Sequence, residues 1–159
     1  MANDIFAGTL LILIATDAFE AYKAATGAVL DNTTTLLQVT PAQFAKLKSL
    51  FINVNGVCVF TWQCGVIITS LVLFFSFHQA SFELTPDAQL WPRKLNHLVN
   101  GTADGLYLVI GDIGIPSGSG YGFILGDTFL QRFYAVLDSS KHRVGLGYTT
   151  STFAEVNYK

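Results

Sequence analysis

Few residues of this chain combine the types and the spacing that catalysis or metal binding requires. Its three histidines, His78, His97 and His142, do not stand at metal-ligand spacing, and we interpret them as surface or core residues. Cys58 and Cys64 form no C-x-x-C pair, and they lie in an apolar run that disfavours a reactive thiolate. No G-x-S-x-G nucleophile motif is present. The sequence therefore predicts neither a metal nor a cofactor.

A glycine-rich segment and two short motifs are the other features that bear on chemistry. Residues 111–122 contain five glycines, one proline and two serines, but neither G-x-x-x-x-G-K-S/T nor a helix-opening G-x-G-x-x-G. Turns are therefore favoured over a phosphate site in this segment. Asn32-Thr33-Thr34 and Asn100-Gly101-Thr102 are N-glycosylation sequons, which matter only if the chain is secreted. Asn32 and Asn100 are thus candidate glycosylation sites.

The composition is that of one folded domain with an uneven distribution of charge. The chain has 159 residues, of which 51% are hydrophobic and 13% charged, and its mean hydropathy of +0.45 excludes a disordered protein. A net charge of −2 and a pI near 5.8 give no electrostatic reason to expect a nucleic-acid partner. No Asp, Glu, Lys or Arg occurs from Ser49 to Phe82, whereas the rest of the chain has the composition of an ordinary soluble domain.

The first elements predicted along the chain are a strand and a helix. Residues 9–15 form a continuous apolar run that is short enough for a buried strand. Asp4, in place of a positive charge, and Asp17, at the end of the run, argue against a signal peptide. Asp17 and Glu20 have the spacing of a helix N-cap and its partner, and Gly27 supplies a left-handed stop. We therefore expect a helix between Asp17 and Gly27.

The remaining pattern predicts a second helix and many short strands. Thr40, Pro41 and Gln43 again have the pattern of a helix start, and Phe44 and Leu47 then share one face. Short strands bounded by turn residues indicate a mainly β fold with short helices. These strands are expected at residues 51–56, 81–85, 106–110, 123–127, 135–138 and 143–146.

Three stretches near the C-terminus carry a specific motif. They read Ile124-Leu-Gly-Asp-Thr-Phe-Leu130, Arg132-Phe-Tyr-Ala-Val-Leu-Asp138 and Arg143-Val-Gly-Leu146, and they resemble the closing block of pepsin-like aspartic peptidases, peptidase family A1. Residues 15–27 and 82–92 look like the basidiomycete branch of that family, the polyporopepsin group. The resemblance implies the C-terminal lobe of the pepsin-like acid protease fold. It would comprise residues 1–57 and 80–150 as a single lobe, an apolar insertion at 58–79 and a tail at 151–159.

The resemblance also implies an activity and a location. In this family each of two lobes provides one Asp, and the two carboxylates meet between the lobes and share one proton. One carboxylate activates a water molecule while the other polarises the scissile carbonyl of an extended peptide. The expectations are therefore an aspartic-type endopeptidase, a hydrolase that acts in proteolysis on polypeptide substrates and is secreted. The other lobe, with its own Asp, is expected to be missing from this chain.

The sequence position that should hold the catalytic Asp of this lobe does not match the family motif. Family sequences read D-T-G-T-T-L before the strand, and an ungapped count back from the matched helix places Phe6 on the Asp and Gly8 and Thr9 on the Gly-Thr pair. Phe cannot act as a base. Asp4 is one pleat displaced, by about 7 Å, and Asp31 lacks the following glycine, so both are weak substitutes. We therefore expect no catalytic residue, as would follow if the gene model began downstream of the active-site codon.

Residues 58–79 have no counterpart in the resembled family, whose hairpin runs from Asn-Gly-Val directly into Phe-Glu-Leu-Thr. A retained intron fits best, because Val and Gln codons can supply the splice signals and the segment reflects thymine-rich codons. A transmembrane helix over 58–77 has the length of about 20 residues that a bilayer needs, but it would split the hairpin. A natural loop of this composition would aggregate. We expect Val54–Val57 to pair with Phe82–Leu84, and the insertion to protrude or to form an isolated helix.

The leading hypothesis is the C-terminal lobe of an aspartic endopeptidase that is inactive as this chain alone. The alternatives are a membrane-anchored β-domain and a non-catalytic pseudo-peptidase that binds peptides in the half-cleft. The leading hypothesis places the strand after the motif beside the Ile-Leu-Gly block. The core should then contain Leu11, Leu13, Ile124, Leu125, Phe133, Val136 and Val144.

Overall fold

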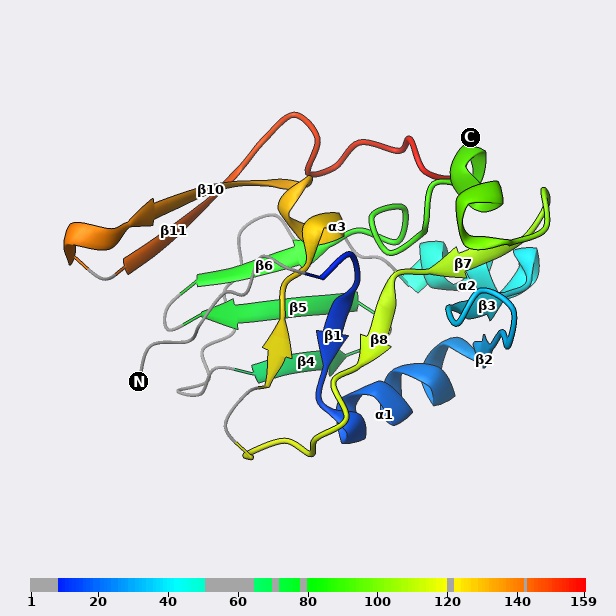
Figure 1. The fold of residues 1–159 in the computed structure, drawn as a ribbon, viewed down its shortest axis with the longest axis horizontal. Coiled ribbons are helices and arrows are strands. Elements are labelled where there is room, and N and C mark those ends of the chain that lie inside the picture. The colour runs from blue at the N-terminus through cyan, green and yellow to red at the C-terminus, as the bar shows by residue number, and fades with distance from the viewer. Residues whose placement is uncertain (1–8, 51–64, 70–71, 78–79, 120–121, 142) are drawn as a thin grey trace.

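The computed structural model describes residues 9–50, 65–69, 72–77, 80–119, 122–141 and 143–159. Within them, short strands form four small sheets, and short helices connect and cover the sheets (Figure 1). This architecture confirms the prediction of a mainly β fold with short helices. The elements in chain order are β1 (Ile12–Ile14), α1 (Thr16–Thr26), β2 (Val29–Leu30), β3 (Leu37–Val39), α2 (Pro41–Leu50), β4 (Gly65–Thr69), β5 (Val72–Phe77), β6 (Ala80–Leu84), η1 (Arg93–Val99), β7 (Leu106–Leu108), β8 (Ile110–Asp112), β9 (Phe123–Ile124), α3 (Asp127–Leu130), β10 (Phe133–Asp138), η2 (Ser139–Lys141) and β11 (Arg143–Tyr148).

The strand β1 lies at the centre of its sheet. It pairs in parallel with β8 and antiparallel with β9, so that Leu13 lies opposite Ile124. Ile12 and Ile14 are fully buried, whereas Leu13 between them is half-buried, because successive side chains of a strand point to opposite faces. The strand predicted for residues 9–15 is therefore confirmed at its centre, and it lies beside the Ile-Leu-Gly block as expected.

The helix α1 begins two residues earlier than its sequence pattern predicts. Its N-cap is Ala15, which makes no side-chain cap, so the prediction of Asp17 as the N-cap is wrong. Asp17 lies in the first turn and accepts hydrogen bonds from the backbone N–H and the hydroxyl of Ser117, both at 2.8 Å. At the other end, Gly27 has a φ of 69° and its N–H donates to the carbonyl of Lys23, as the left-handed stop predicts.

The start of α2 follows its sequence pattern. The backbone N–H of Thr40 donates to Oε1 of Gln43 at 2.7 Å, and the N–H of Gln43 donates to the hydroxyl of Thr40 at 3.2 Å. This reciprocal pair is the capping box that the sequence predicts. Phe44 and Leu47 are buried on one face, also as predicted. The strand expected at residues 51–56 lies outside the described residues.

The predicted strand at residues 106–110 is buried throughout but divides into two strands. β7 pairs with β3, while β8 pairs with β1 in a different sheet. Between them, the N–H of Val109 donates to the carbonyl of Gln89 at 2.9 Å, and the carbonyl of Val109 accepts from Ile12 at 3.0 Å. The division therefore joins the sheet of β1 to the sheet of β2, β3 and β7.

The described part of the apolar segment forms strands. β4 pairs with β5, and β5 pairs with β6, so that Phe75 lies opposite Phe82 in an antiparallel three-stranded sheet. β4 also lies next to α1. The prediction of a protruding segment or an isolated helix is therefore wrong for residues 65–69 and 72–77. A continuous apolar run has no period that separates a strand from a helix, and the β-branched and aromatic residues here favour the strand. Val54–Val57, the predicted partner of Phe82–Leu84, lies outside the described residues.

The described helices do not support the alternative of a membrane-anchored β-domain. No helix in the described part of the chain is long and apolar enough to cross a membrane. The described residues of the 58–77 segment are strands of the β4–β5–β6 sheet instead.

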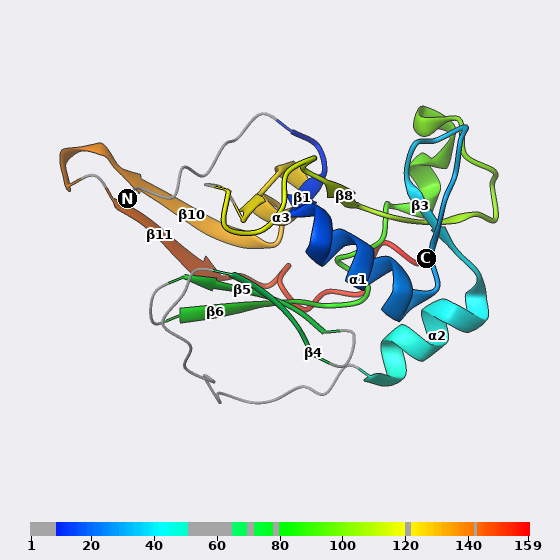
Figure 2. The same ribbon diagram turned by 90° about the horizontal axis from the view of Figure 1, so that it is seen from below.

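The hydrophobic core predicted from the sequence is correct only in part. Leu125 and Phe133 are buried, but Val136 and Val144 are 47% and 42% exposed, so their prediction as core residues is wrong. Both valines lie on the β10–β11 hairpin, whose strands pair only with each other among the described residues. Figures 1 and 2 show this hairpin extending from the body of the molecule. The half-buried members of the predicted set are Leu11, Leu13 and Ile124.

Candidate active-site region

The motif that would carry the catalytic carboxylate ends at the first described residue. Asp4, Phe6 and Gly8 lie outside the described residues, so the position of Phe6 on the family Asp stays a prediction. Thr9, the last position of the Gly-Thr pair, is half-buried, and its hydroxyl donates to the carbonyl of Leu11 at 2.9 Å. The chain is therefore held by a local hydrogen bond as it leaves the motif and enters β1.

The backbone around Thr9 is bound to the start of α3. The N–H of Asp127 donates to the carbonyl of Thr9 at 2.9 Å. The carbonyl of Leu10 accepts from the backbone N–H of Thr128 at 3.2 Å and from its hydroxyl at 3.0 Å. The first amide groups of a helix have no partner inside the helix. Here the strand that follows the motif supplies those partners.

Gly126 permits this close approach of the two backbones. A Cβ atom at Gly126 would overlap the carbonyl oxygen of Leu11 and would come within 2.7 Å of the carbonyl oxygen of Thr9. The φ of Gly126 is −81°, which any residue can adopt, so the requirement is for space rather than for backbone freedom. This explains physically why glycine stands in the Ile-Leu-Gly-Asp block.

The glycine-rich loop is tied to the start of α1. Asp112 accepts hydrogen bonds from the hydroxyl of Thr16 at 2.7 Å and from the N–H of Gly114 at 2.8 Å. Gly114 and Gly118 have φ values of 81° and 84°, which favour glycine. Together with the bonds from Ser117 to the carboxylate of Asp17, these contacts indicate that the loop serves turn formation, as predicted from its composition.

Asp31 lies in the turn between β2 and β3, in a different sheet from β1. Its carboxylate accepts the backbone N–H of Thr34 at 2.7 Å, and this hydrogen bond holds the pKa of Asp31 below its ordinary value. A carboxylate that accepts a hydrogen bond within its own turn stabilises that turn. Its role as a substitute for the catalytic Asp of the family stays a prediction.

Two buried acids lie in the stretch 82–92, which resembles the family, but the sequence pattern gave neither of them a role. Glu83 on β6 is 9% exposed, its Oε1 atom has no hydrogen-bond partner in the described part of the chain, and burial raises its pKa. Asp87 forms a buried ion pair with Arg132, with Oδ1 and Nη2 3.2 Å apart. Only an unexpected charge within a predicted strand could have pointed to Glu83. Nothing local pointed to the partner of Asp87, because Arg132 is 45 positions away.

The described residues hold no cluster of three or more His, Cys, Asp or Glu side chains that could bind a metal ion.

The comparisons with known proteins agree with this fold and with the Ile-Leu-Gly-Asp block beside β1. The family model for eukaryotic aspartyl proteases matches residues 6–149, and the chain therefore belongs to the aspartyl protease family. The chain is similar to polyporopepsin from Irpex lacteus, with 45% identity over 156 residues that make up 98% of this chain and 39% of the relative. The crystal structure of the aspartic proteinase from Irpex lacteus matches with a TM-score of 0.78 and 45% identity, over 95% of this chain and 38% of that one. The chain thus corresponds to one lobe of the pepsin-like fold.

Proposed function

We propose that this chain forms the C-terminal lobe of an aspartic-type endopeptidase and that it does not hydrolyse peptides by itself. The observation that carries the proposal is the residue at the motif position. The family match begins at residue 6, and the ungapped count along the sequence puts Phe6 at the position of the family Asp. A pair of carboxylates that shares one proton needs both members, one to activate water and one to polarise the carbonyl. Without either member the chemistry has no acid and no base.

A second part of the proposal concerns substrate binding, and it is supported by how little of the relative the chain covers. The chain covers 39% of the curated relative, so most of a two-lobed cleft would come from sequence that the chain does not match. Positioning of a substrate can account for about 7–11 kcal/mol of a barrier. We therefore infer that the polypeptide substrate is bound only when a second lobe completes the cleft.

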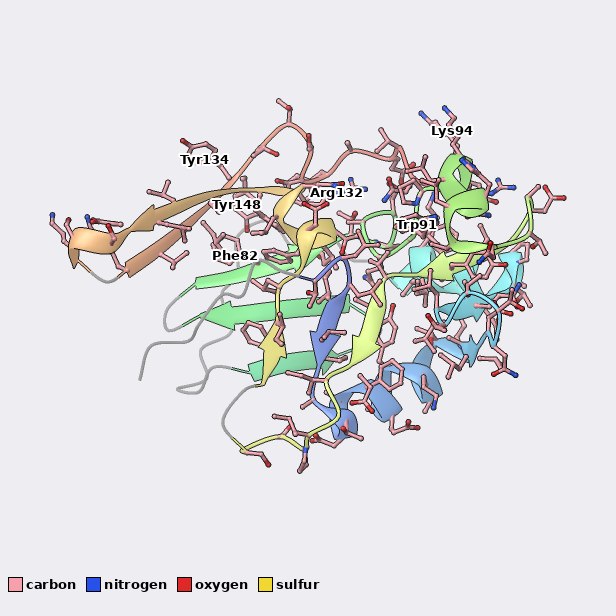
Figure 3. The ribbon with its side chains drawn as sticks, in the orientation of Figure 1. Phe82, Trp91, Lys94, Arg132, Tyr134 and Tyr148 are labelled. Carbon is pink, nitrogen blue, oxygen red and sulfur yellow. The ribbon has the colours of Figure 1, made fainter. Side chains whose placement is uncertain are left out.

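The exposed hairpin supplies structural support for a missing neighbour. Tyr134, Leu137 and Tyr148 on β10 and β11 are 67%, 72% and 59% exposed. Tyr134 points away from the body of the molecule (Figure 3). Leu137 and Tyr148 lie on one face of the hairpin and Tyr134 lies on the other, so both faces expose apolar side chains. Exposed apolar surface marks a binding face in many proteins. We propose that the rest of a two-lobed endopeptidase covers this hairpin.

The domain limits and the location also belong to the proposal. Residues 1–57 and 80–150 would build the lobe, and residues 58–79 would be an insertion from a retained intron. A transcript that lacks codons 58–79 would support the insertion, whereas transcripts that all contain these codons would contradict it. Secretion is proposed from the family resemblance and accords with an enzyme that acts on polypeptides outside the cell.

The activity proposal is tested with purified chain and an acid-denatured protein substrate, with and without pepstatin. We expect no cleavage by the chain and none by the Phe6→Asp, Ala7→Thr double variant, which rebuilds Asp-Thr-Gly-Thr. The same variant co-refolded with the N-terminal lobe of polyporopepsin should gain pepstatin-sensitive cleavage, and the unmodified chain in that complex should not. Pepstatin-sensitive cleavage by the unmodified chain alone would overturn the proposal and direct attention to Asp4 or Asp31.

A further inference from the structure

Two exposed asparagines lie at the end of the molecule opposite the β10–β11 hairpin. Asn32 is in the turn between β2 and β3, and Asn100 directly follows η1 as its C-cap, with a φ of 57°. Both residues are exposed, and each is followed by threonine two positions later. Figures 1 and 2 place β2, β3 and η1 together at one end of the molecule and the hairpin at the other.

The asparagines that support the fold are different ones. Nδ2 of the buried Asn96 donates to the carbonyls of Thr102 at 2.8 Å and Gly105 at 3.0 Å. Nδ2 of Asn157 donates to the carbonyls of Asp87 and Leu90. Neither Asn96 nor Asn157 stands in a sequon. The side-chain amides of Asn32 and Asn100, in contrast, make no hydrogen bond with any described residue. Among the described asparagines, those in sequons are therefore the ones whose amide nitrogen can be modified without the loss of a structural bond.

The turn that presents Asn32 is held by other groups. The N–H of Asp31 donates to the carbonyl of Leu36 at 2.8 Å, and the N–H of Leu36 donates to the hydroxyl of Thr34 at 3.1 Å. The carboxylate of Asp31 accepts the N–H of Thr34. A bulky substituent on Asn32 would therefore leave the turn intact.

The same holds for Asn100, whose backbone rather than side chain closes η1. Its N–H and that of Gly101 donate to the carbonyl of Asn96. The next residue, Thr102, donates its N–H to the hydroxyl of Tyr107 at 3.0 Å. The side chain of Asn100 takes no part in these bonds, so its amide remains open to solvent.

We propose that Asn32 and Asn100 are both N-glycosylated, which rests on the secretion included in the proposed function. The donor is a lipid diphosphate oligosaccharide, used by the transferase of the secretory pathway. Nδ2 of each asparagine forms a bond to the anomeric carbon of the sugar and gives up one proton, and the lipid diphosphate leaves with the electron pair of the broken C–O bond. The two glycans keep this end of the molecule in contact with solvent and leave the hairpin end for protein contacts.

The test uses the full chain behind a cleavable secretory leader in yeast. The leader delivers the chain to the transferase, so the result does not depend on peptide hydrolysis or on the native export route. We expect two steps of increased mass that an endoglycosidase removes, one step lost in Asn32→Gln, the other in Asn100→Gln, and both in the double variant. Digestion with a peptide N-glycosidase, which hydrolyses the glycosylated amide itself, in water labelled with ¹⁸O should mark Asn32 and Asn100 by their conversion to labelled Asp.

Matched variants separate the sequon from the local structure. Thr33→Val changes the middle residue and Thr102→Ser changes the hydroxyl residue, and both keep a sequon, so both steps should remain. A wild-type chain that the endoglycosidase does not alter would overturn the proposal. A single step of increased mass would overturn the proposal for the asparagine that is not converted to labelled Asp. Mass that persists in the double variant would also overturn it.

Discussion

Gly126 occupies a position where two backbones meet without room for a side chain. The carbonyl oxygens of Thr9 and Leu11 face the site of its missing Cβ, and the neighbouring amides of Asp127 and Thr128 bind this same stretch of backbone. A larger residue would have to separate β1 from α3. The strand that leaves the motif would then lose its anchor, because these hydrogen bonds fix its start.

We predict that Gly126→Ala lowers the free energy of unfolding by about 1–3 kcal/mol, the usual cost of overpacking. Gly147→Ala on β11 is the matched control, because no described atom lies within 4 Å of its Cβ position and its φ is not positive. Chemical denaturation of both variants measures the difference. Equal stability of the two variants would show that the contact between β1 and the Gly126 backbone is not tight in solution.

Glu83 predicts a dependence of stability on pH. Burial raises its pKa in the folded chain above the ordinary value of 4.5, so the folded state binds this proton more tightly than the unfolded state does. Stability therefore falls as the pH rises from about 4.5 through the pKa of the folded state, and the penalty is absent at lower pH. Asp17, Asp31 and Asp138 have lowered pKa values and act in the opposite sense below pH 4, but a Glu83 variant shares them.

The prediction for Glu83→Gln is a melting temperature that diverges from that of the unmodified chain as the pH rises. The two should unfold at similar temperatures near pH 4, and the variant should be the more stable of the two near pH 7. Glu155→Gln is the control, because the Glu155 side chain is 65% exposed, and it should show no such divergence. If the melting temperatures of Glu83→Gln and the unmodified chain changed in parallel at all pH values, water would have to reach the Glu83 carboxylate.

The C-terminal segment, residues 151–159, is an element that packs although it contains no helix or strand. Asp87 accepts the backbone N–H groups of residues 156–158 at 2.9–3.1 Å. Arg132 pairs with Asp87 and donates to two carbonyls of the same segment, those of Ser151 and Ala154. The ring of Tyr158 stacks on Phe44 with centroids 5.2 Å apart. One buried ion pair therefore holds the end of the chain against α2 and the start of the hairpin.

We predict that Asp87→Ala lowers the free energy of unfolding by about 3–5 kcal/mol, because it leaves the Arg132 charge buried without its partner. The control is Asp104→Ala, which removes a fully exposed acid from a surface pair with Arg93 and should leave the unfolding midpoint unchanged. Limited proteolysis should also cut residues 151–159 faster in the Asp87 variant. Equal midpoints for the two variants would contradict the role of Asp87.

At the scale of the whole molecule, the hairpin carries the largest group of exposed apolar side chains among the described residues. The side chains that share one face of β10 and β11 include Leu137 opposite Val144 and Phe133 opposite Tyr148. Tyr148 contacts the body through Phe82, with ring centroids 5.8 Å apart (Figure 3). Leu137, next to the end of β10, is 72% exposed. A purified chain that presents such a face to solvent should associate with itself.

We predict concentration-dependent association of the purified chain in sedimentation velocity, and a marked reduction of it by Leu137→Glu. Val29→Glu places the same charge on a valine that is 68% exposed at the opposite end, and it should leave the association unchanged. The prediction that the chain associates through the hairpin would be refuted if the chain stayed monomeric at all concentrations. It would also be refuted if Leu137→Glu and Val29→Glu reduced the association equally.

Local signals in the sequence determined the elements whose partners lie within a few residues. Gly27 ends α1 and the pair Thr40 and Gln43 opens α2, because each acts on backbone groups three or four positions away. The closing block from Ile124 onward identified the family and its mainly β lobe, since the spacing of those residues along the chain is itself the signal. The position of Phe6 on the catalytic Asp also comes from spacing, and it stays a prediction.

Only the tertiary structure decided which faces are buried and where the charges pair. The run at residues 9–15 has no alternation, so the burial of Ile12 and Ile14 rather than Leu13 depends on β8 and β9, which are far away in sequence. Asp17 binds Ser117 across 100 positions, and no local pattern contains that partner. Val136 alternates like a core residue yet is exposed, because burial requires a second layer that a strand's own sequence does not encode.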